Sequence, residues 1–164
     1  MDTPCWYALY TRARHEKKVD FLLKSKGIES YLPLQRVLRR WSDRKKWVEE
    51  PLFRCYVFVR VLPQDRLLAL QTPGVVKMVC FGGEPAVIPH EQIEAVRRVL
   101  EETRNFEPCA YFTVGDRVEV MKGPLAGLEG ILVRKKKGYR LVIVIDSIRQ
   151  ALSVEVDAGE VRRL

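Results

Sequence analysis

Residues 51–59 read PLFRCYVFV, and the way their side chains alternate governs how the first half of the chain folds. Successive side chains of a strand point to opposite faces. One face is expected to carry Phe53, Cys55, Val57 and Val59, and the other Arg54, Tyr56, Phe58 and Arg60. A strand that is apolar on both faces fits the centre of a sheet, whereas aromatic rings between arginines on an open face form a contact surface for protein or RNA. The pattern leaves both interpretations open.

The elements around this strand alternate between strand and helix. Apolar and aromatic runs predict strands at residues 5–11, 28–41, 46–61 and 75–81, the third broken at Pro51. Helical spacing of apolar residues predicts a helix that ends at Gly27, a short helix at residues 65–71 and another after Pro89. This order predicts an α+β domain, in which helices pack against an antiparallel sheet.

The second half of the chain contains short strand-like runs separated by Gly-rich turns. They fall at residues 116–121, 130–135, 139–146, 150–156 and 160–164. Short strands at this spacing favour a small all-β barrel. Because Pro108 interrupts the pattern before them, we expect a first domain at residues 1–105, a linker at residues 106–112 and a barrel at residues 113–164.

Charge is concentrated in the first of these regions. The chain of 164 residues has a formal net charge of +8. Residues 1–105 contain 19 basic and 13 acidic residues, a net charge of +6, and the remainder contains 10 and 8, a net charge of +2. This excess favours a polyanionic partner such as DNA, RNA or an acidic protein surface, although a basic protein that is merely soluble would have the same charge.

Sequence motifs of enzymes and metal sites are absent. The four cysteines are widely separated without a Cys-x-x-Cys pair, and there is no GxSxG, HExxH or Gly-rich phosphate loop with its lysine. The neighbours Glu49 and Glu50 point to opposite faces of a strand, so they cannot act as an acid/base pair. We therefore expect a non-enzymatic protein without metal or cofactor. The lack of a signal segment or a long apolar run favours a reduced, cytoplasmic protein that does not enter the membrane.

A cluster of cations surrounds the predicted hairpin tip at residues 41–44. Guanidinium groups pair with phosphates, and the indoles of Trp41 and Trp47 are able to stack on bases. The alternative is a solvated tip whose tryptophans anchor it to the sheet. The predicted nucleic-acid-binding residues are Arg12, Arg36, Arg39, Arg40, Arg44, Lys45 and Lys46.

Several motifs occur in an order that resembles a known family. WYALY at residues 6–10 is followed by EKKV at 16–19, by PLFRCYVFV at 51–59 and by TPGV at 72–75. VGDRVEV at residues 114–120 and GPLAGLEG at 123–130 form a second set. The first set resembles the N-terminal domain of NusG-type transcription factors, and the second resembles their C-terminal KOW motif, an SH3-like barrel. Together they cover nearly the whole chain.

Two further stretches are similar to the specialised paralogues, RfaH and the capsule-operon regulators. They are WSDRKK at residues 41–46, which leads into EEPLF, and FGGEPAVIP at residues 81–89. RfaH-type factors store the KOW segment as a helical hairpin. Here the β-branched run at residues 141–148, Pro124 and several glycines disfavour helix. We therefore expect a stable five-stranded barrel in the resting protein, tethered flexibly through residues 104–112, with strands and no helical hairpin over residues 114–156.

The resemblance implies a transcription elongation and antitermination factor that binds the RNA polymerase clamp and contacts DNA near the transcription bubble. It implies that the KOW domain recruits a partner, either termination factor Rho or a small ribosomal subunit protein, and we expect a monomer. The residues implied in polymerase binding are Tyr7, Phe53, Tyr56, Gln64, Leu67 and Leu68.

Two observations qualify this expectation. The family usually has Pro-Gly or Pro-Asn between the matched Phe and Tyr, whereas this chain has Arg54 and Cys55 where the family makes its local bend. RCYVFV at residues 54–59 also partly matches the aromatic strand of RNA-recognition domains. The alternative function is therefore a stand-alone RNA-binding or ribosome-associated KOW protein.

Overall fold

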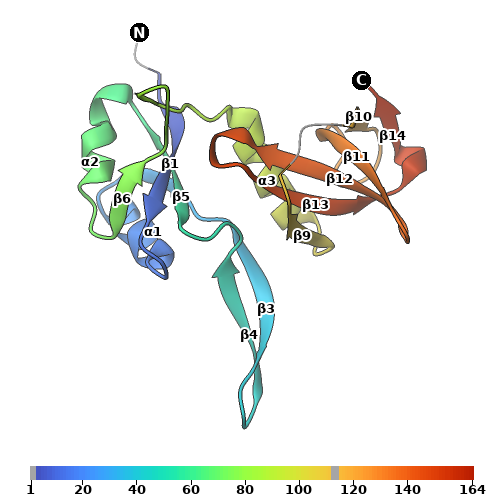
Figure 1. Ribbon diagram of the computed structural model, residues 1–164, viewed down its shortest axis with the longest axis horizontal. Helices are drawn as coiled ribbons and strands as arrows, with labels where there is room; N and C mark the ends of the chain where they lie inside the picture. Colours follow the sequence, from blue (N-terminus) through green and yellow to red (C-terminus); the bar gives the residue numbers. More distant parts are fainter. Residues whose placement is uncertain (1–2, 112–114) are drawn as a thin grey trace. The chain divides into compact units, whose positions relative to one another are not determined.

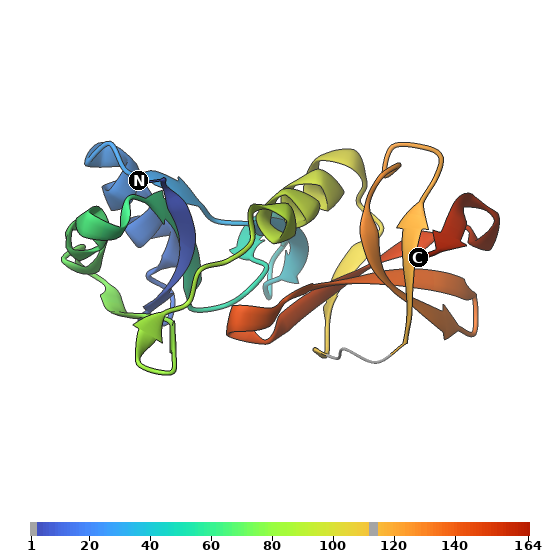
Figure 2. The ribbon, with the colours of Figure 1, turned by 90° about the horizontal axis from the view of Figure 1, so that it is seen from above.

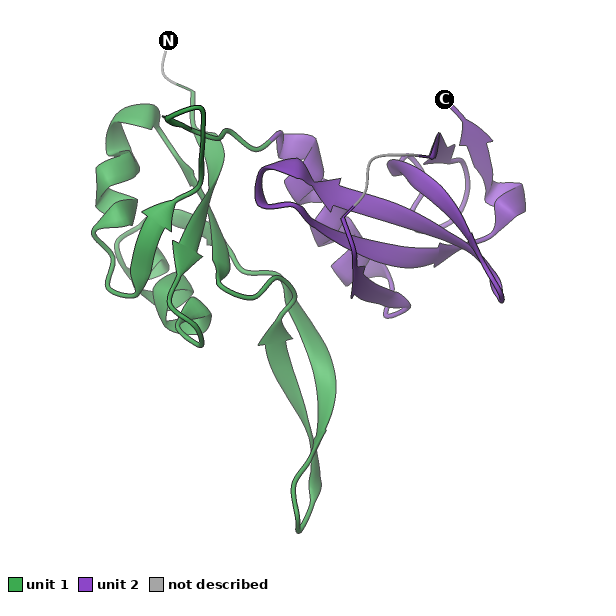
Figure 3. Ribbon diagram, viewed as in Figure 1, with its two compact units in different colours: residues 1–88 green, residues 89–164 purple. Residues whose placement is uncertain are grey.

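The computed structural model describes residues 3–111 and 115–164. Their contacts divide the chain into two compact units, an N-terminal unit of residues 1–88 and a C-terminal unit of residues 89–164 (Figure 3). The sequence predicted a division after residue 105. The difference arises because the third helix and the segment after it belong to the C-terminal unit.

The N-terminal unit is built on a four-stranded antiparallel sheet in the order β2-β5-β1-β6 (Figure 1). Its strands are β1 (Cys5–Thr11), β2 (Glu29–Tyr31), β5 (Tyr56–Val61) and β6 (Val75–Met78). The two central strands, β1 and β5, pair from Cys5↔Val61 to Tyr10↔Tyr56. Aromatic and β-branched residues dominate both, as suits strands covered on two faces.

Two helices cover one face of this sheet. They are α1 (Glu16–Ser25) and α2 (Arg66–Leu70), the second preceded by the 3-10 turn η1 (Pro63–Asp65). Val19 and Leu23 of α1 and Ala69 of α2 pack with the inward-facing residues of the sheet. The sheet residues of this core are Tyr7, Leu9, Val57, Val59, Val61 and Met78. The predicted antiparallel sheet with helices against it is confirmed for this unit.

Two hairpins extend from the sheet. The longer one joins β3 (Leu34–Arg40) and β4 (Lys45–Pro51) and projects away from the rest of the N-terminal unit (Figure 1). The shorter one joins β7 (Cys80–Phe81) and β8 (Glu84–Pro85). Its turn is Gly82-Gly83, with φ angles of 60° and 84° that favour glycine.

The C-terminal unit contains a six-stranded antiparallel sheet in the order β14-β10-β11-β12-β13-β9, with helix α3 (His90–Glu102) against β12 (Figure 2). The strands are β9 (Phe106–Cys109), β10 (Asp116–Val120), β11 (Glu129–Lys135), β12 (Gly138–Ile145), β13 (Gln150–Val156) and β14 (Val161–Arg163). Two 3-10 turns, η2 (Asp146–Ile148) and η3 (Ala158–Glu160), connect the last three. Gly130 of β11 lies so close to β12 that a Cβ there would come within 2.5 Å of the Val142 carbonyl oxygen.

Part of the segment predicted as a linker forms a strand in the structure. Its residues 106–109 form β9, paired with β13 from Val154↔Phe106 to Ala151↔Cys109, while residues 112–114 lie outside the described part of the chain. A flexible tether over residues 106–109 is therefore wrong, because their backbone groups complete a sheet. The prediction of strands rather than a helical hairpin is confirmed for the described residues of 114–156.

Candidate functional site

The turn before β5 holds Cys55 in a left-handed conformation with a φ of 68°. This region costs a residue with a side chain about 1 kcal/mol or more and normally favours glycine or asparagine. Two hydrogen bonds hold the turn. The Cys55 backbone N–H donates to Oε2 of the buried Glu16 at 2.9 Å, and the Cys55 carbonyl accepts from the Thr11 backbone N–H at 2.8 Å. The chain thus makes the bend with Arg54-Cys55 in place of a glycine.

The bend changes which face Phe53 occupies. Alternation predicted that Phe53 would share a face with Val57 and Val59, and that prediction is wrong, because residues 52–55 form a turn and β5 begins at Tyr56. The Phe53 ring lies edge-to-face with Phe58, their centroids 6.4 Å apart. Tyr56 lies edge-to-face with Tyr10 at 5.6 Å. Phe53 and Tyr56 consequently occupy the same side of the sheet.

Tyr7 lies on the opposite face of the sheet from Tyr56. It is 2% exposed and belongs to the core beneath α1 and α2, where burial raises the pKa of its hydroxyl. The Arg66 guanidinium lies 5.9 Å from the centre of its ring. Phe53 is equally buried, at 2% exposure, whereas Tyr56 is half-buried. The structure therefore does not bring all three rings to one surface.

Helix α2 carries the remaining residues of the predicted polymerase-binding set. Gln64 is exposed just before it, and Leu67 and Leu68 are 61% and 52% exposed. A cleft beside α2 is lined by Arg66, Leu67, Val76, Met78 and Cys80, among others. Large apolar side chains exposed on one short helix are a feature of protein-binding surfaces.

The β3–β4 hairpin presents two faces with different charge. Its register places Arg36 opposite Glu49, Leu38 opposite Trp47 and Arg40 opposite Lys45, and these six residues define the Trp47 face. The reverse face carries the pairs Gln35↔Glu50, Val37↔Val48 and Arg39↔Lys46. On the reverse face, the Arg39 Nε donates to the Glu50 carboxylate at 2.6 Å, so Glu50 neutralises one of its two cations.

The Trp47 face combines an exposed ring with cations. Trp47 is 57% exposed and Leu38 is 40% exposed, and the Arg36 guanidinium lies 5.5 Å from the centre of the Trp47 ring. Near the tip, Arg44 lies 5.7 Å from the ring centre of Trp41, which is 48% exposed. These exposures disfavour the alternative that the tryptophans anchor the hairpin to the sheet. Within the described chain, no ion pair involves Arg40, Lys45 or Lys46.

Arg12 stands apart from the hairpin cations. It follows β1 directly, and its backbone N–H donates to the Gly74 carbonyl at 2.9 Å, so it lies at the end of the sheet. Sequence reasoning also missed Glu16 as the residue that supports the bend. Its position in the first turn of α1 gave no sign of a contact 39 residues away.

The described residues contain no group of three or more His, Cys, Asp or Glu side chains that could hold a metal ion. No helix among them is long and apolar enough to cross a membrane.

The fold is that of a mixed α/β protein with mostly antiparallel sheets, and a basic hairpin projects from its N-terminal unit. The family model of NusG, described as transcription termination factor NusG, matches residues 4–97. The chain belongs to the NusG family.

Full-length relatives agree with this assignment. The transcription termination/antitermination protein NusG of Pseudomonas aeruginosa is 26% identical over 97% of this chain and 98% of its own length. NusG of Thermus thermophilus is 25% identical over 95% of this chain and 96% of its own. Among solved structures, that of Thermotoga maritima NusG, titled for its domain interaction, matches with a TM-score of 0.53 at 23% identity, over 99% of this chain and 98% of that one.

Proposed function

We propose that this protein is a transcription elongation and antitermination factor that binds RNA polymerase through its N-terminal unit. The observation that carries the proposal is the supported bend at Arg54-Cys55. It gives Phe53 and Tyr56 a common side of the sheet despite the departure from the usual family residues. A factor of this kind needs no catalytic residues, since it acts by binding the elongating state of the polymerase more tightly than the paused state.

The residues of the polymerase-binding set have two different roles in this proposal. The half-buried Tyr56 contacts the clamp. The exposed Leu67 and Leu68, with Gln64 beside them, lie over the other face of the sheet and contact the polymerase on the opposite side of its cleft. The buried Tyr7 and Phe53 support the surface from beneath, because rings with 2% exposure offer little area to a partner.

The hairpin provides the second contact. We propose that its Trp47 face lies against DNA near the transcription bubble, where its unneutralised cations meet phosphates and the Trp47 indole meets unpaired bases. Arg12 contributes a separate phosphate contact at the end of the sheet. The less charged C-terminal unit acts as the KOW domain and recruits a protein partner, either Rho or a small ribosomal subunit protein.

The finer assignments follow from the same motifs. We infer a cytoplasmic monomer and a specialised paralogue similar to RfaH and the capsule-operon regulators, on the basis of residues 41–46 and 81–89. A second candidate function, binding of free RNA, is favoured by one observation, the exposure of two indoles beside arginines on the hairpin.

Affinity purification of the tagged full-length chain, with and without nuclease treatment, separates the two functions. The polymerase-binding proposal predicts nuclease-resistant recovery of RNA polymerase. Recovery of RNA without polymerase would replace it with the second candidate.

A further inference from the structure

Strand β9 lies on an edge of the sheet that would otherwise be open. In the order β14-β10-β11-β12-β13-β9, strand β9 is the last and pairs with β13 alone. An unpaired strand edge exposes a row of backbone N–H and C=O groups that are able to pair with another extended chain. The short strand β9 therefore decides whether the β13 edge is covered or available.

One hydrogen bond shows which backbone groups of β13 face β9. The Glu155 N–H donates to the Asn105 carbonyl at 3.1 Å. Because hydrogen-bonded pairs alternate along an antiparallel ladder, the backbone groups of Ser153 and Ala151 also face β9, whereas those of Leu152 and Val154 face β12.

Pro108 gives β9 an outer edge that resists further pairing. It stands opposite Leu152, at a position whose backbone nitrogen points away from β13. A proline costs the β13 pairing nothing there, but it removes a donor from the outer edge. While β9 is in place, this side of the sheet lacks a regular strand edge.

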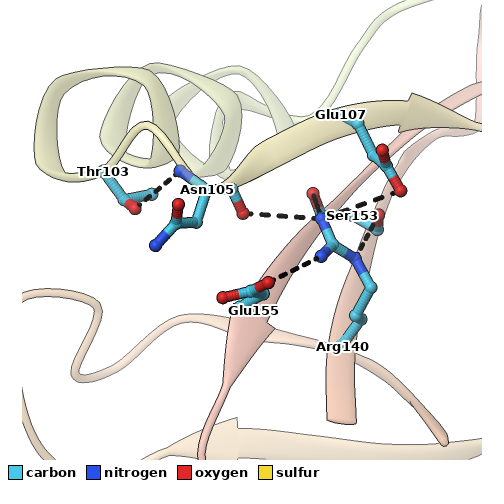
Figure 4. A network of polar contacts seen from close by, with 6 residues as sticks. All are labelled: Thr103, Asn105, Glu107, Arg140, Ser153 and Glu155. Carbon is cyan, nitrogen blue, oxygen red and sulfur yellow. Dashed lines mark hydrogen bonds and ion pairs between the residues drawn. The ribbon is translucent and has the colours of Figure 1, made fainter. Parts of the chain in front are cut away.

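Few side chains hold β9 in position. Phe106 and Cys109 are half-buried, and Glu107 and Pro108 are exposed. The main polar attachment is Arg140 of β12, whose side chain is 15% exposed (Figure 4). Its Nη2 donates to the Asn105 carbonyl at 3.4 Å and lies 4.0 Å from the Glu107 carboxylate.

Arg140 is itself fixed on the β13 side. Its Nε donates to the Ser153 hydroxyl at 2.8 Å, its Nη2 donates to the Ser153 carbonyl at 3.1 Å, and its Nη1 lies 3.6 Å from the Glu155 carboxylate. Three of these five interactions are made to Ser153 and Glu155 of β13, so the guanidinium stays in place when β9 leaves.

The β13 edge also favours a negative charge in any strand that pairs with it. Burial raises the pKa of the Cys109 thiol in β9, while the positive charges of Lys135 and Arg140 act to lower it. Both cations therefore act on the space that β9 occupies, and a carboxylate opposite Ser153 complements them.

We propose that β9 is a displaceable cover, and that the β13 edge beneath it binds an extended, acidic segment of a protein partner by strand addition. Such a segment runs antiparallel to β13 and places a carboxylate where Glu107 now lies. This proposal deepens the recruiting role proposed for the C-terminal unit and rests on it only for the existence of a partner.

Two variants of the full-length chain test the cover. Glu107→Pro removes the carboxylate and the N–H that faces Ser153, whereas Glu107→Ala, the matched control, removes only the carboxylate. In Glu107→Pro, we expect amide hydrogen exchange at Ala151, Ser153 and Glu155 to become at least about tenfold faster. Exchange at Leu152 and Val154 stays unchanged, which shows that the sheet remains folded. Unchanged exchange at all five amides would overturn the proposal.

The binding site is tested with a synthetic peptide of residues 104–111 under reducing conditions, a probe that carries the acidic strand itself. We expect it to bind the Glu107→Pro chain with saturation, and a peptide with Glu107→Lys to bind at least about tenfold more weakly. Binding of both peptides alike, or of neither, would contradict the proposal. Self-association of the Glu107→Pro chain without peptide binding would contradict it too, because the edge would then pair with a second copy. None of these readouts involves RNA polymerase, so they stay separate from the proposed polymerase contact.

Discussion

The carboxylate of Glu16 accepts a hydrogen bond from the backbone N–H of Cys55 across 2.9 Å, and so joins the first turn of α1 to the bend before β5. This contact supports a non-glycine residue in a left-handed conformation, with a φ of 68°. The position of Phe53 and Tyr56 on one side of the sheet depends on it.

Replacing Glu16 with alanine leaves the Cys55 N–H without its acceptor in a partly buried place. We expect Glu16→Ala to lower the free energy of unfolding by about 1–3 kcal/mol. Lys17→Ala, on the exposed side of the same helix, is the matched control and is expected to change it by less than about 0.5 kcal/mol. Urea unfolding measures both, and equal values would show that the contact contributes nothing.

The Cys55 thiol provides a pH-dependent readout of the same contact. Burial first, and the negative charge of Glu16 second, raise its pKa, so less of the reactive thiolate is present at neutral pH. We expect iodoacetamide to modify Cys55 several-fold more slowly than the exposed Cys80, with the rate of Cys55 rising only at more alkaline pH.

Glu16→Gln keeps an acceptor but removes the charge, and should lower the pKa of Cys55 and speed its modification. Mass spectrometry of the alkylated peptides gives the rates. A faster reaction at Cys55 than at Cys80 in the parent chain would contradict this prediction.

The two faces of the hairpin predict different effects of removing charge. The double variant Arg40→Ala with Lys45→Ala removes two cations without ion pairs from the Trp47 face. The double variant Arg39→Ala with Lys46→Ala also removes two cations, but Glu50 already neutralises one of them, Arg39. We expect the first pair to weaken DNA binding more and to reduce the slope of log affinity against log salt by about 1–2.

Fluorescence anisotropy with a labelled bubble duplex at several salt concentrations measures both slopes. Removal of Arg39, Arg40, Arg44 and Lys45 together is expected to flatten the salt dependence further. An unchanged slope in this fourfold variant would show that the hairpin is only a solvated loop.

The sequence predicted the N-terminal sheet well because its strands carry strong local signals. The runs around Tyr7 and Val57 are dense in aromatic and β-branched residues, and these residues form the central pair β1 and β5. The side of the sheet on which Phe53 lies could not be predicted from neighbouring residues, because strand alternation fails where Cys55 adopts a positive φ. The residue that supports this turn, Glu16, is distant in the sequence. The same limit applies to β9, because Pro108 signals a break but says nothing of pairing with Leu152.

The sequence predicted which residues belong to the candidate site better than it predicted where their side chains lie. The cations and tryptophans of the hairpin were identified, but their division into two faces needed the register between Leu38 and Trp47. The burial of Tyr7 was hidden, because an aromatic residue in a strand looks the same in a sequence whether it faces a core or a partner.

Buried and exposed members of the polymerase-binding set should separate experimentally. Tyr7→Ala and Phe53→Ala each remove a fully packed ring, and we expect each to cost about 3–5 kcal/mol of stability. Leu67→Ala and Leu68→Ala truncate exposed side chains, so they should weaken polymerase binding without lowering the melting temperature measurably. A stable Tyr7→Ala variant with a selective binding defect would instead place that ring in the interface.

Recognition of transcribing RNA polymerase is tested by the affinity of the protein for an elongation complex assembled on a synthetic nucleic-acid scaffold. Naked scaffold of the same sequence, at the same salt concentration, is the control. We expect at least about tenfold tighter binding to the elongation complex than to the naked scaffold, because protein contacts add to the phosphate contacts. Equal affinity for the two would show that the protein does not recognise the polymerase.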